Sequence, residues 1–378
     1  MKKEIPYFDV EPTIEKYPEA KYYLFVGERS NGKTFSSLNR GVKKYYNENG
    51  SQFAYIRRWG EDVRKKKMTE LFSGHIEKGF IKKDTEGCAD TITFENGKFY
   101  LGRTNEGEVE WSDDPCGYVF DLNSMEHFKS LSFPRIKTII FDEFIARNGY
   151  LPNEWQLFTN TLSTIIRERD DVEIIMLGNT VNKYSIYFEE MGIKHIGEQK
   201  EGTIDVYKYN KLMGNRTVQL EVVVEMTPST SKKGGKPSEV YFAFDNPQLQ
   251  MITDGSWEIS LYPHLNVKLR PMDIITNFFV EFNREILHGQ ICIVDDVGYF
   301  VFIHLKTTPL KNENEDIIYT TYSDERWNYK TCLTKQSDKL SIFIMTCLRE
   351  NKIFYSTNEV GEIFRNYIMW SDSYSIKN

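Results

Sequence analysis

The chain has 378 residues, of which 40% are hydrophobic and 14% aromatic. This length and composition exclude an intrinsically disordered protein and predict two domains rather than one compact core. The net charge of -7 argues against a surface coated for tight nucleic-acid binding, although it leaves room for local basic loops.

The cysteines and histidines show no metal-binding spacing. The five cysteines form no C-x-x-C pair and the six histidines are dispersed, which predicts reduced thiols in a cytosolic protein and no zinc site. The N-terminus lacks an apolar signal core, and no apolar run reaches the roughly 20 residues that a membrane helix needs. We therefore expect a soluble, intracellular protein with no membrane partner.

The first 185 residues predict strands that alternate with helices, which is typical of a mostly parallel α/β sheet. Asn96-Gly97 lies in an alternating segment and predicts a type I′ hairpin, so residues 75–115 are expected to form an inserted hairpin region outside the parallel sheet. In chain order, strands are expected over 22–27, 52–59, 137–142 and 172–177, and helices over 33–48, 61–72 and 153–169.

The alternation fades near residue 200, where two strand-like runs precede a segment rich in Gly, Pro, Ser and Lys that predicts a mobile loop. The C-terminal region predicts an antiparallel meander of three strands, with turns at His288-Gly289 and at 295–298. The two runs cover 203–209 and 218–225, the loop 227–237, and the meander strands 278–286, 290–294 and 299–305; a helix over 340–349, a strand over 353–356 and a helix over 360–370 follow.

The loop after the first predicted strand has the spacing G-x-x-x-x-G-K-T of a phosphate-binding P-loop. In such a loop the backbone amides close around phosphate oxygens, and the following helix adds its positive dipole end. Lys33 is expected to reach the β- and γ-phosphates, and Thr34 to ligate Mg²⁺. A chance match in a surface loop is the alternative. The expected nucleotide-binding residues are Gly27, Glu28, Arg29, Ser30, Asn31, Gly32, Lys33 and Thr34.

The predicted strand over 137–142 runs into two acids, Asp142-Glu143. We expect Asp142 to hold Mg²⁺, directly or through water, and Glu143 to polarise a water for in-line attack on the γ-phosphate. An ordinary exit from strand to loop is the alternative.

Further polar residues lie at places where they can complete such a site. Asn179 follows the next apolar strand and is expected beside the γ-phosphate, unless it is only a turn residue. Arg167 and Arg169 end a predicted helix, where either can be an arginine finger for a neighbouring subunit or a solvated cation favoured by the helix dipole. Arg29 can contact phosphate, a partner subunit or an acid in a salt bridge.

The motifs favour deliberate ATP hydrolysis. The nearest match to the guanine-reading Asn-Lys-x-Asp motif is NKYS at 182–185, which lacks the aspartate and leaves guanine specificity unsupported. Small-molecule kinases usually lack a glutamate that activates water, because water attack would waste ATP. Asp142-Glu143 therefore favours an ATPase. A P-loop phosphotransferase or a nucleotide-gated scaffold that does not move DNA is the alternative.

A family resemblance rests on five segments of the sequence. In chain order they are GERSNGKT, FAYIRR, TIIFDEF, a helix ending IIRERDDV, and IIMLGN. The chain resembles the genome-packaging ATPases of small tailed bacteriophages with protein-primed linear genomes, which are short, terminase-like motors. The resemblance covers residues 20–185 well and extends more loosely to 278–305.

This resemblance implies an ASCE-type P-loop NTPase domain in a homopentameric ring, which drives double-stranded DNA into a procapsid. The ring would sit in the host cell cytoplasm at the portal vertex, bound directly or through an RNA or protein adaptor. Carried over by position, Arg167 matches the family's trans-acting arginine finger and Asn179 its coupling motif. The P-loop matches Walker A, and Asp142 and Glu143 match Walker B.

The family's C-terminal domain resembles a ribonuclease-H-like nuclease, in which several acids converge on two metals. Here Asp295 and Asp296 fall at a turn and the strand over 353–356 contains no acid, so we expect a vestigial domain that grips DNA or docks, with doubtful nuclease activity. The predicted domains are a P-loop ATPase over 1–200, a linker region over 201–264, and a smaller α+β ribonuclease-H-like domain over 265–378.

Two basic segments are candidates for non-specific, salt-sensitive contact with DNA phosphates. One lies on the predicted helix after FAYIRRW, where a solvated helix face is the alternative, and the other lies in the predicted mobile loop. The candidates are Lys65, Lys66 and Lys67 in the first segment and Lys232, Lys233 and Lys236 in the second.

Overall fold

A computed structural model describes residues 7–128, 131–147, 149–213, 216–229, 257, 260–295, 298–310 and 312–374 of the chain. These residues form two compact units. The N-terminal unit comprises Met1–Ala146, Trp155–Lys183 and His195–Glu258, and the C-terminal unit comprises Arg147–Glu154, Tyr184–Lys194 and Ile259–Asn378.

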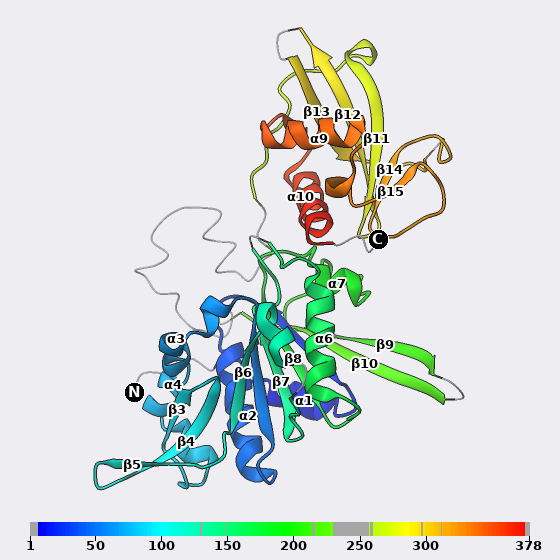
Figure 1. Ribbon diagram of the computed structural model, residues 1–378. Helices are drawn as coiled ribbons and strands as arrows, with labels where there is room; N and C mark the ends of the chain where they lie inside the picture. The colour runs from blue at the N-terminus through cyan, green and yellow to red at the C-terminus, as the bar shows by residue number, and fades with distance from the viewer. Residues whose placement is uncertain are drawn as a thin grey trace. The chain divides into compact units, whose positions relative to one another are not determined.

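The N-terminal unit is built on a sheet to which the described residues contribute ten strands, ordered β3-β4-β6-β2-β7-β8-β1-β10-β9, with β5 paired to β4 (Figure 1). The neighbours in the part of this order that reads β6-β2-β7-β8-β1-β10 all pair in parallel. The strands are β1 Tyr22–Gly27, β2 Gln52–Arg57, β3 Thr91–Glu95, β4 Lys98–Asn105, β5 Glu108–Trp111, β6 Gly117–Asp121, β7 Ile136–Asp142, β8 Glu173–Asn179, β9 Ile204–Met213 and β10 Arg216–Met226.

The predicted strands of the parallel core and the helices predicted over 33–48 and 153–169 are confirmed. Near-continuous apolar runs suit parallel strands that are covered on both faces. Helix α2 packs closely on β2: a Cβ added at Gly41 would lie 2.8 Å from Phe53 Cδ1. The helical segments are α1 Glu11–Lys16, α2 Lys33–Asn47, α3 Lys65–Glu70, α4 Ser73–Glu77, α5 Phe80–Asp84 and α6 Glu154–Ile166, with 3₁₀ turns at Gly60–Val63 and Leu122–Phe128.

One predicted helix is wrong. The charged segment over 61–72 forms a 3₁₀ turn and then α3, rather than one helix. Arg64 between them is extended, with φ -63° and ψ 148°, and this conformation ends the first segment. Asp62 in the turn pairs with Lys67 at 2.7 Å and with Arg57 at 3.6 Å, so its carboxylate ties the turn to α3 and to β2.

The predicted hairpin is confirmed. Asn96 and Gly97 both have positive φ, 48° and 77°, as a type I′ turn requires. The hairpin strands β3 and β4 are antiparallel, and β4 pairs antiparallel with β6, so the inserted region extends the edge of the parallel sheet.

The expected linker over 201–264 needs correction at its start. Strand β10 pairs in parallel with β1, and Val222, Val223 and Val224 are buried in the sheet. Strand β9 pairs antiparallel with β10. The sheet therefore extends to Met226, and the chain leaves it only after that residue.

The C-terminal unit holds a second sheet, with the described strands in the order β15-β14-β11-β12-β13-β16 (Figure 1). Strands β11, β12 and β13 form the predicted antiparallel meander, while β14 is parallel to β11 and β15 to β14. The elements are α7 Ile186–Glu190, β11 Ile274–Phe282, β12 Glu285–Val294, β13 Gly298–Leu305, β14 Ile318–Thr320, β15 Tyr329–Thr331, α9 Lys339–Arg349, β16 Ile353–Tyr355 and α10 Asn358–Ser373, with 3₁₀ turns at Pro271–Asp273 and Leu333–Lys335.

The first turn of the meander lies at Asn283-Arg284, and the predicted turn at His288-Gly289 is wrong. Asn283 and Arg284 have φ of 51° and 67°, which gives a tight hairpin without glycine. Gly289 instead lies inside β12, where an added Cβ would come within 2.1 Å of Phe278 Cζ. This glycine makes room for an aromatic ring rather than for a turn.

No helix in the described ranges is both long and apolar enough to cross a membrane. All five cysteine thiols are free in the structure, and all except Cys88 are buried.

A buried histidine lies beside the P-loop helix. The His75 ring stacks on Phe35, with ring centroids 3.7 Å apart, and lies 5.0 Å from the ring of Phe72. Its Nε2 donates a hydrogen bond to the Phe35 carbonyl at 2.9 Å, while the buried Nδ1 has no partner within the described ranges. Burial, with a smaller contribution from Lys78, lowers the pKa of His75 to about 4.

We therefore expect His75 to destabilise the fold in acid. The folded-state pKa of about 4 lies below the ordinary value of 6.5, so the unfolded chain binds more protons between these values. The part of the free energy of unfolding that depends on a neutral His75 is fully present above pH 6.5 and is lost as the pH falls toward 4. It amounts to about 3 kcal/mol at most. Urea denaturation at several pH values should show a smaller acid loss for His75→Phe than for the parent chain.

His195→Phe is the matched control, because the side chain of His195 is 62% exposed. It should leave the acid loss unchanged. Some loss should persist in His75→Phe, since burial also lowers the pKa of His288 to about 4. Equal acid losses in His75→Phe and the parent would contradict the prediction.

Candidate functional site

The P-loop connects the end of β1 to the start of α2. Strand β1 ends at Gly27, and α2 begins at Lys33 after Gly32, whose φ of 103° favours glycine. Gly27 has no room for a side chain, since an added Cβ would lie 1.9 Å from Thr227 Oγ1. The N-cap residue of α2, Gly32, has no side chain to cap the helix, and the Lys33 amide makes a long hydrogen bond of 3.4 Å to Asn31 Oδ1. The positive end of the helix dipole therefore favours an anion here.

Lys33 is a buried cation held by neutral oxygens. Its Nζ donates to the carbonyls of Glu28 at 2.7 Å and Gly27 at 3.3 Å, and to Oδ1 of Asn31 at 3.2 Å. Desolvation lowers the pKa of Lys33 to about 8, against the opposing charges of Asp142 and Glu28. A polyphosphate would offset that desolvation, so the arrangement suits a phosphate ligand.

Asp142, at the end of β7, joins the P-loop helix to the neighbouring strand β2. Thr34 Oγ1 donates to its carboxylate oxygens at 3.3 and 3.2 Å, and the Tyr55 hydroxyl donates to Oδ2 at 2.8 Å. Burial and the charge of Asp142 raise the pKa of Tyr55 well above its usual range, so the phenol remains a donor. A hydroxyl and a carboxylate side by side are oxygen ligands of the kind Mg²⁺ prefers, and these residues fit the ion.

Glu143 follows Asp142 in a left-handed conformation, with φ of 57°. Its amide donates to Asp142 Oδ1 at 3.0 Å, and its half-exposed carboxylate pairs with Arg57 at 2.7 Å. Buried Arg58 donates to the carbonyls of Glu143 and Phe144, at 3.0 and 2.8 Å. Such a backbone persists only where its surroundings hold it, and here the hydrogen bonds from Arg58 do so.

Tyr55, Arg57 and Arg58 also contact the site, although no role was predicted for them from the sequence. All three lie at the end of β2, which pairs with β7 up to Ile56↔Phe141, so their side chains reach the two acids. The available signal was a pair of arginines where a buried apolar strand ends. That pattern identifies a sheet edge but does not show which strand lies next to it.

The structure brings Asn179 to the same site. Strand β8 lies beside β1, with Gly27 opposite Asn179, and Asn179 Oδ1 lies 3.4 Å from Lys33 Nζ. Because β8 also pairs with β7, the ends of three parallel strands meet around Lys33.

These residues surround a cavity of about 410 Å³. Arg29 lines it, is exposed, and has no hydrogen-bond or ion-pair partner among the described residues, so the expected salt bridge to an acid is not observed there. Glu28 is not among the lining residues: its Oε2 accepts a hydrogen bond from Ser229 Oγ at 2.9 Å. The lining residues are Tyr7, Arg29, Ser30, Asn31, Gly32, Lys33, Thr34, Phe35, Asp142, Glu143, Leu177 and Asn179.

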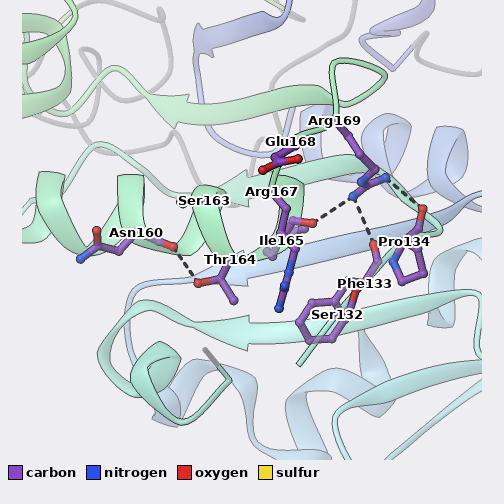
Figure 2. Close-up of a pocket in the computed structure, with 10 residues that line it drawn as sticks. All are labelled: Ser132, Phe133, Pro134, Asn160, Ser163, Thr164, Ile165, Arg167, Glu168 and Arg169. Atoms are coloured by element: carbon purple, nitrogen blue, oxygen red, sulfur yellow. Dashed lines mark hydrogen bonds between the residues drawn. The ribbon is translucent and has the colours of Figure 1, made fainter. Parts of the chain in front are cut away.

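Arg167 and Arg169 lie at a second cavity, of about 880 Å³, which shares no lining residue with the first (Figure 2). Helix α6 ends at Ile166, and Arg167 follows it with φ of 53°. Arg167 Nη2 donates one hydrogen bond, to the carbonyl of Leu131 at 2.7 Å. Figure 2 shows Arg169 turned toward the segment that leads into β7. Its guanidinium donates to the carbonyls of Phe133, Pro134, Ile136, Ile165 and Ile166.

The candidate DNA-contact lysines are placed only in part. Lys65, Lys66 and Lys67 are exposed on α3, and Lys67 pairs with Asp62, so this face is at least partly an ordinary solvated one. The loop candidates Lys232, Lys233 and Lys236 lie outside the described residues.

The two arginines should differ in their effect on stability. Arg169→Ala would leave several partly buried carbonyls without a donor and should lower the free energy of unfolding by about 2–4 kcal/mol. Arg167→Ala removes one bond at an exposed side chain and should cost less than about 1 kcal/mol. Urea denaturation of both variants beside the parent chain measures this difference, and equal losses would contradict it.

Comparison with known proteins gives a consistent relationship. Residues 18–196 match the family model of the podovirus DNA encapsidation protein, Gp16. A DNA packaging protein of Bacillus phage B103 is 29% identical over 174 residues, covering 43% of this chain and 46% of that protein. A DNA packaging protein of Bacillus phage phi29 is 27% identical over 170 residues, covering 43% and 44%.

The solved structure of the Phi-28 gp11 DNA packaging motor is similar in fold, with a TM-score of 0.54 at 15% identity over 98% of this chain and 99% of that one. The matches to these two relatives span less than half the length of each relative. The family-model match over residues 18–196 includes the P-loop and the two acids. The resemblance to the genome-packaging proteins of small tailed phages is therefore confirmed, and it lies in residues 18–196, which match the model of the podovirus DNA encapsidation protein (Gp16) family.

Proposed function

We propose that this chain is an ATP-driven motor that translocates double-stranded DNA into a preformed procapsid. The observation that carries the proposal is the convergence of Lys33, Thr34, Asp142 and Glu143 on one cavity, in a chain whose relatives are DNA packaging proteins. The strand order β7-β8-β1 supports an ASCE-type P-loop domain, since one strand separates the P-loop strand from the strand that ends in the two acids.

ATP binds in this proposal with its phosphates between Lys33 and the N-terminus of α2, where the ammonium charge and the helix dipole favour an anion. Thr34 and Asp142 would hold Mg²⁺, which offsets phosphate charge when it is bound. Asn179, 3.4 Å from the Lys33 ammonium, would contact the same end of the nucleotide.

Glu143 orients the attacking water and takes its proton as general base. Its carboxylate is half-exposed and therefore accessible to water, and the ion pair with Arg57 fixes its direction. Arg57 also lies 3.5 Å from Asp142, so one guanidinium aligns both acids. We assign Arg57 a positioning role rather than a catalytic one.

Arg167 acts at a neighbouring subunit's site in this proposal. It does not line the P-loop cavity of its own chain, and its single hydrogen bond leaves most of the guanidinium available. Arg169 is committed to carbonyls of its own chain and is the weaker candidate for the finger. A shared site requires a ring of subunits, and we propose a homopentamer at the procapsid portal vertex in the host cell cytoplasm, reached directly or through an RNA or protein adaptor.

The C-terminal unit is proposed to be a vestigial ribonuclease-H-like domain. The strand order β13-β12-β11-β14-β15, with three antiparallel strands followed by two parallel ones, supports this fold. Asp295 is exposed at the turn after β12, Asp296 lies outside the described residues, and β16 carries no acid. Within the described ranges no three or more His, Cys, Asp or Glu residues cluster to hold a metal. We propose DNA gripping or docking for this domain.

The decisive measurement is the ATPase rate with and without double-stranded DNA. The motor predicts stimulation by DNA that weakens as salt increases, because contact is mainly with phosphates. An unchanged rate at several salt concentrations would contradict the motor and favour a nucleotide-gated scaffold. Phosphate transfer to a small-molecule acceptor, rather than to water, would favour a phosphotransferase.

Glu143→Gln should retain ATP binding and lower DNA-stimulated turnover by about 100-fold or more, because the general base is lost while the phosphate-binding loop is intact. Binding and steady-state hydrolysis are measured on the same preparation. Glu70→Gln, at an exposed position of α3, is the matched control and should turn over normally. Normal turnover in Glu143→Gln would remove Glu143 from the mechanism.

The shared site is tested by mixing subunits. Lys33→Ala should abolish nucleotide binding, and Arg167→Ala should remove the charge supplied to a neighbour, so each variant should be inactive alone. Mixed rings contain interfaces where an intact Lys33 meets an intact Arg167, and part of the activity should return. A mixture as inactive as the separate variants would contradict a finger that acts between subunits.

A further inference from the structure

The cavity at the P-loop has an aromatic side as well as a polyphosphate-binding side. Tyr7 and Phe35 line it together with Lys33 and Thr34. Tyr7 is 50% exposed, although the residue after it, Phe8, is buried in the core of the N-terminal unit. Core packing therefore accounts for Phe8 but not for an aromatic ring left half-exposed at the mouth of this cavity.

The backbone around Tyr7 is fixed to the phosphate-binding loop. The Phe8 amide donates to the Asn31 carbonyl at 2.8 Å, and the Val10 amide donates to Ser36 Oγ at 3.0 Å. A Cβ added at Gly32 would lie 2.9 Å from Tyr7 Cβ, so Tyr7 passes directly over the loop glycine. The ring is thus held at a set position relative to the amides that face a phosphate, which is a preorganised arrangement.

Other aromatic rings support Tyr7 from the adjoining helices. Its ring is stacked with Phe35 at a centroid distance of 5.8 Å and an interplanar angle of 20°, and Phe35 is stacked in turn on buried His75 at 3.7 Å. Lys78 Nζ lies 4.2 Å from the Tyr7 ring centroid and donates to its hydroxyl at 3.0 Å. Phe35 and Lys78 therefore hold the Tyr7 ring in place, while half of the residue remains exposed.

We propose that Tyr7 is the residue on which the base of the bound nucleoside triphosphate stacks. This inference rests on the proposed nucleotide binding and adds a base-recognition surface to it. Lys33 and the α2 amides can hold only the charged end of the ligand, whereas an uncharged π-face suits a heterocyclic base. Stacking area favours a purine over a pyrimidine, so ATP is expected to bind more tightly than CTP.

The test compares ATP with inorganic tripolyphosphate, which has the phosphates but no base. Tyr7→Ala should weaken ATP binding by about 5- to 150-fold, the range measured when an aromatic base-stacking partner is removed. Tripolyphosphate binding should be unchanged. Tyr7→Phe should bind ATP like the parent chain, and Tyr7→Leu, which keeps apolar bulk against Phe35, should be as weak as Tyr7→Ala.

Two results would overturn the assignment. If Tyr7→Ala weakens tripolyphosphate as much as ATP, Tyr7 only supports the loop; if it weakens neither, the base does not stack there. Lys33→Ala should weaken both ligands, which separates failure of the phosphate site from failure of the base site. A parent chain that binds neither ligand would overturn the proposed nucleotide binding and this inference together.

Fluorescence of a second variant detects stacking of the base at position 7 directly. Tyr7→Trp places an indole at the same position, and ATP should quench its fluorescence relative to the parent chain, whereas tripolyphosphate should not. Equal responses to the two ligands would show that the ring senses the loop rather than a base.

Discussion

The candidate site depends on one buried carboxylate, Asp142. A charge taken out of water must be compensated by hydrogen bonds, and this carboxylate receives them from Thr34 on α2 and Tyr55 on β2. It therefore holds the start of the P-loop helix against the strand on its other side. The backbone amide of Glu143 also donates to it, so the position of the proposed general base follows from the same group. Loss of Asp142 would disturb more than a metal ligand, since three elements meet there.

The P-loop uses its two sides for different contacts. Its backbone and Lys33 face the cavity, whereas the Glu28 carboxylate and the Asn31 amide nitrogen bind Ser229 and Thr227, just after β10. Gly27 allows Thr227 to approach that closely, because any side chain there would clash with it. The Thr227 amide also donates to the Val26 carbonyl at 2.7 Å, which continues the β1–β10 pairing past the last strand residue. The phosphate-binding loop and the chain leaving the sheet thus form one hydrogen-bonded unit.

Most of the fold could be predicted because its parallel strands are long apolar runs and its helices carry a regular apolar face. The errors arose where two physical causes produce the same residue type. Gly289 looks like a turn residue, but it is a glycine because the Phe278 ring lies over it, and the turn is made by Asn283 and Arg284 in left-handed conformations. The runs now assigned to β9 and β10 looked like a linker, since strand periodicity does not show which sheet a strand joins.

The same distinction limits what sequence can say about the site. The convergence of Lys33, Thr34, Asp142 and Glu143 on one cavity was predictable, because the two motifs that hold them have fixed local spacing. The contact of Arg57 with Glu143 was not predictable, since it exists because β2 lies beside β7, and these segments are far apart in the chain. Arg167 and Arg169 are two residues apart and chemically identical, yet one cation satisfies five carbonyls of its own fold and the other satisfies one. A side chain already committed to that many acceptors would give up several hydrogen bonds to reach another subunit. Structural commitment, rather than sequence position, is therefore the reason why Arg167 and not Arg169 is the one proposed as the finger.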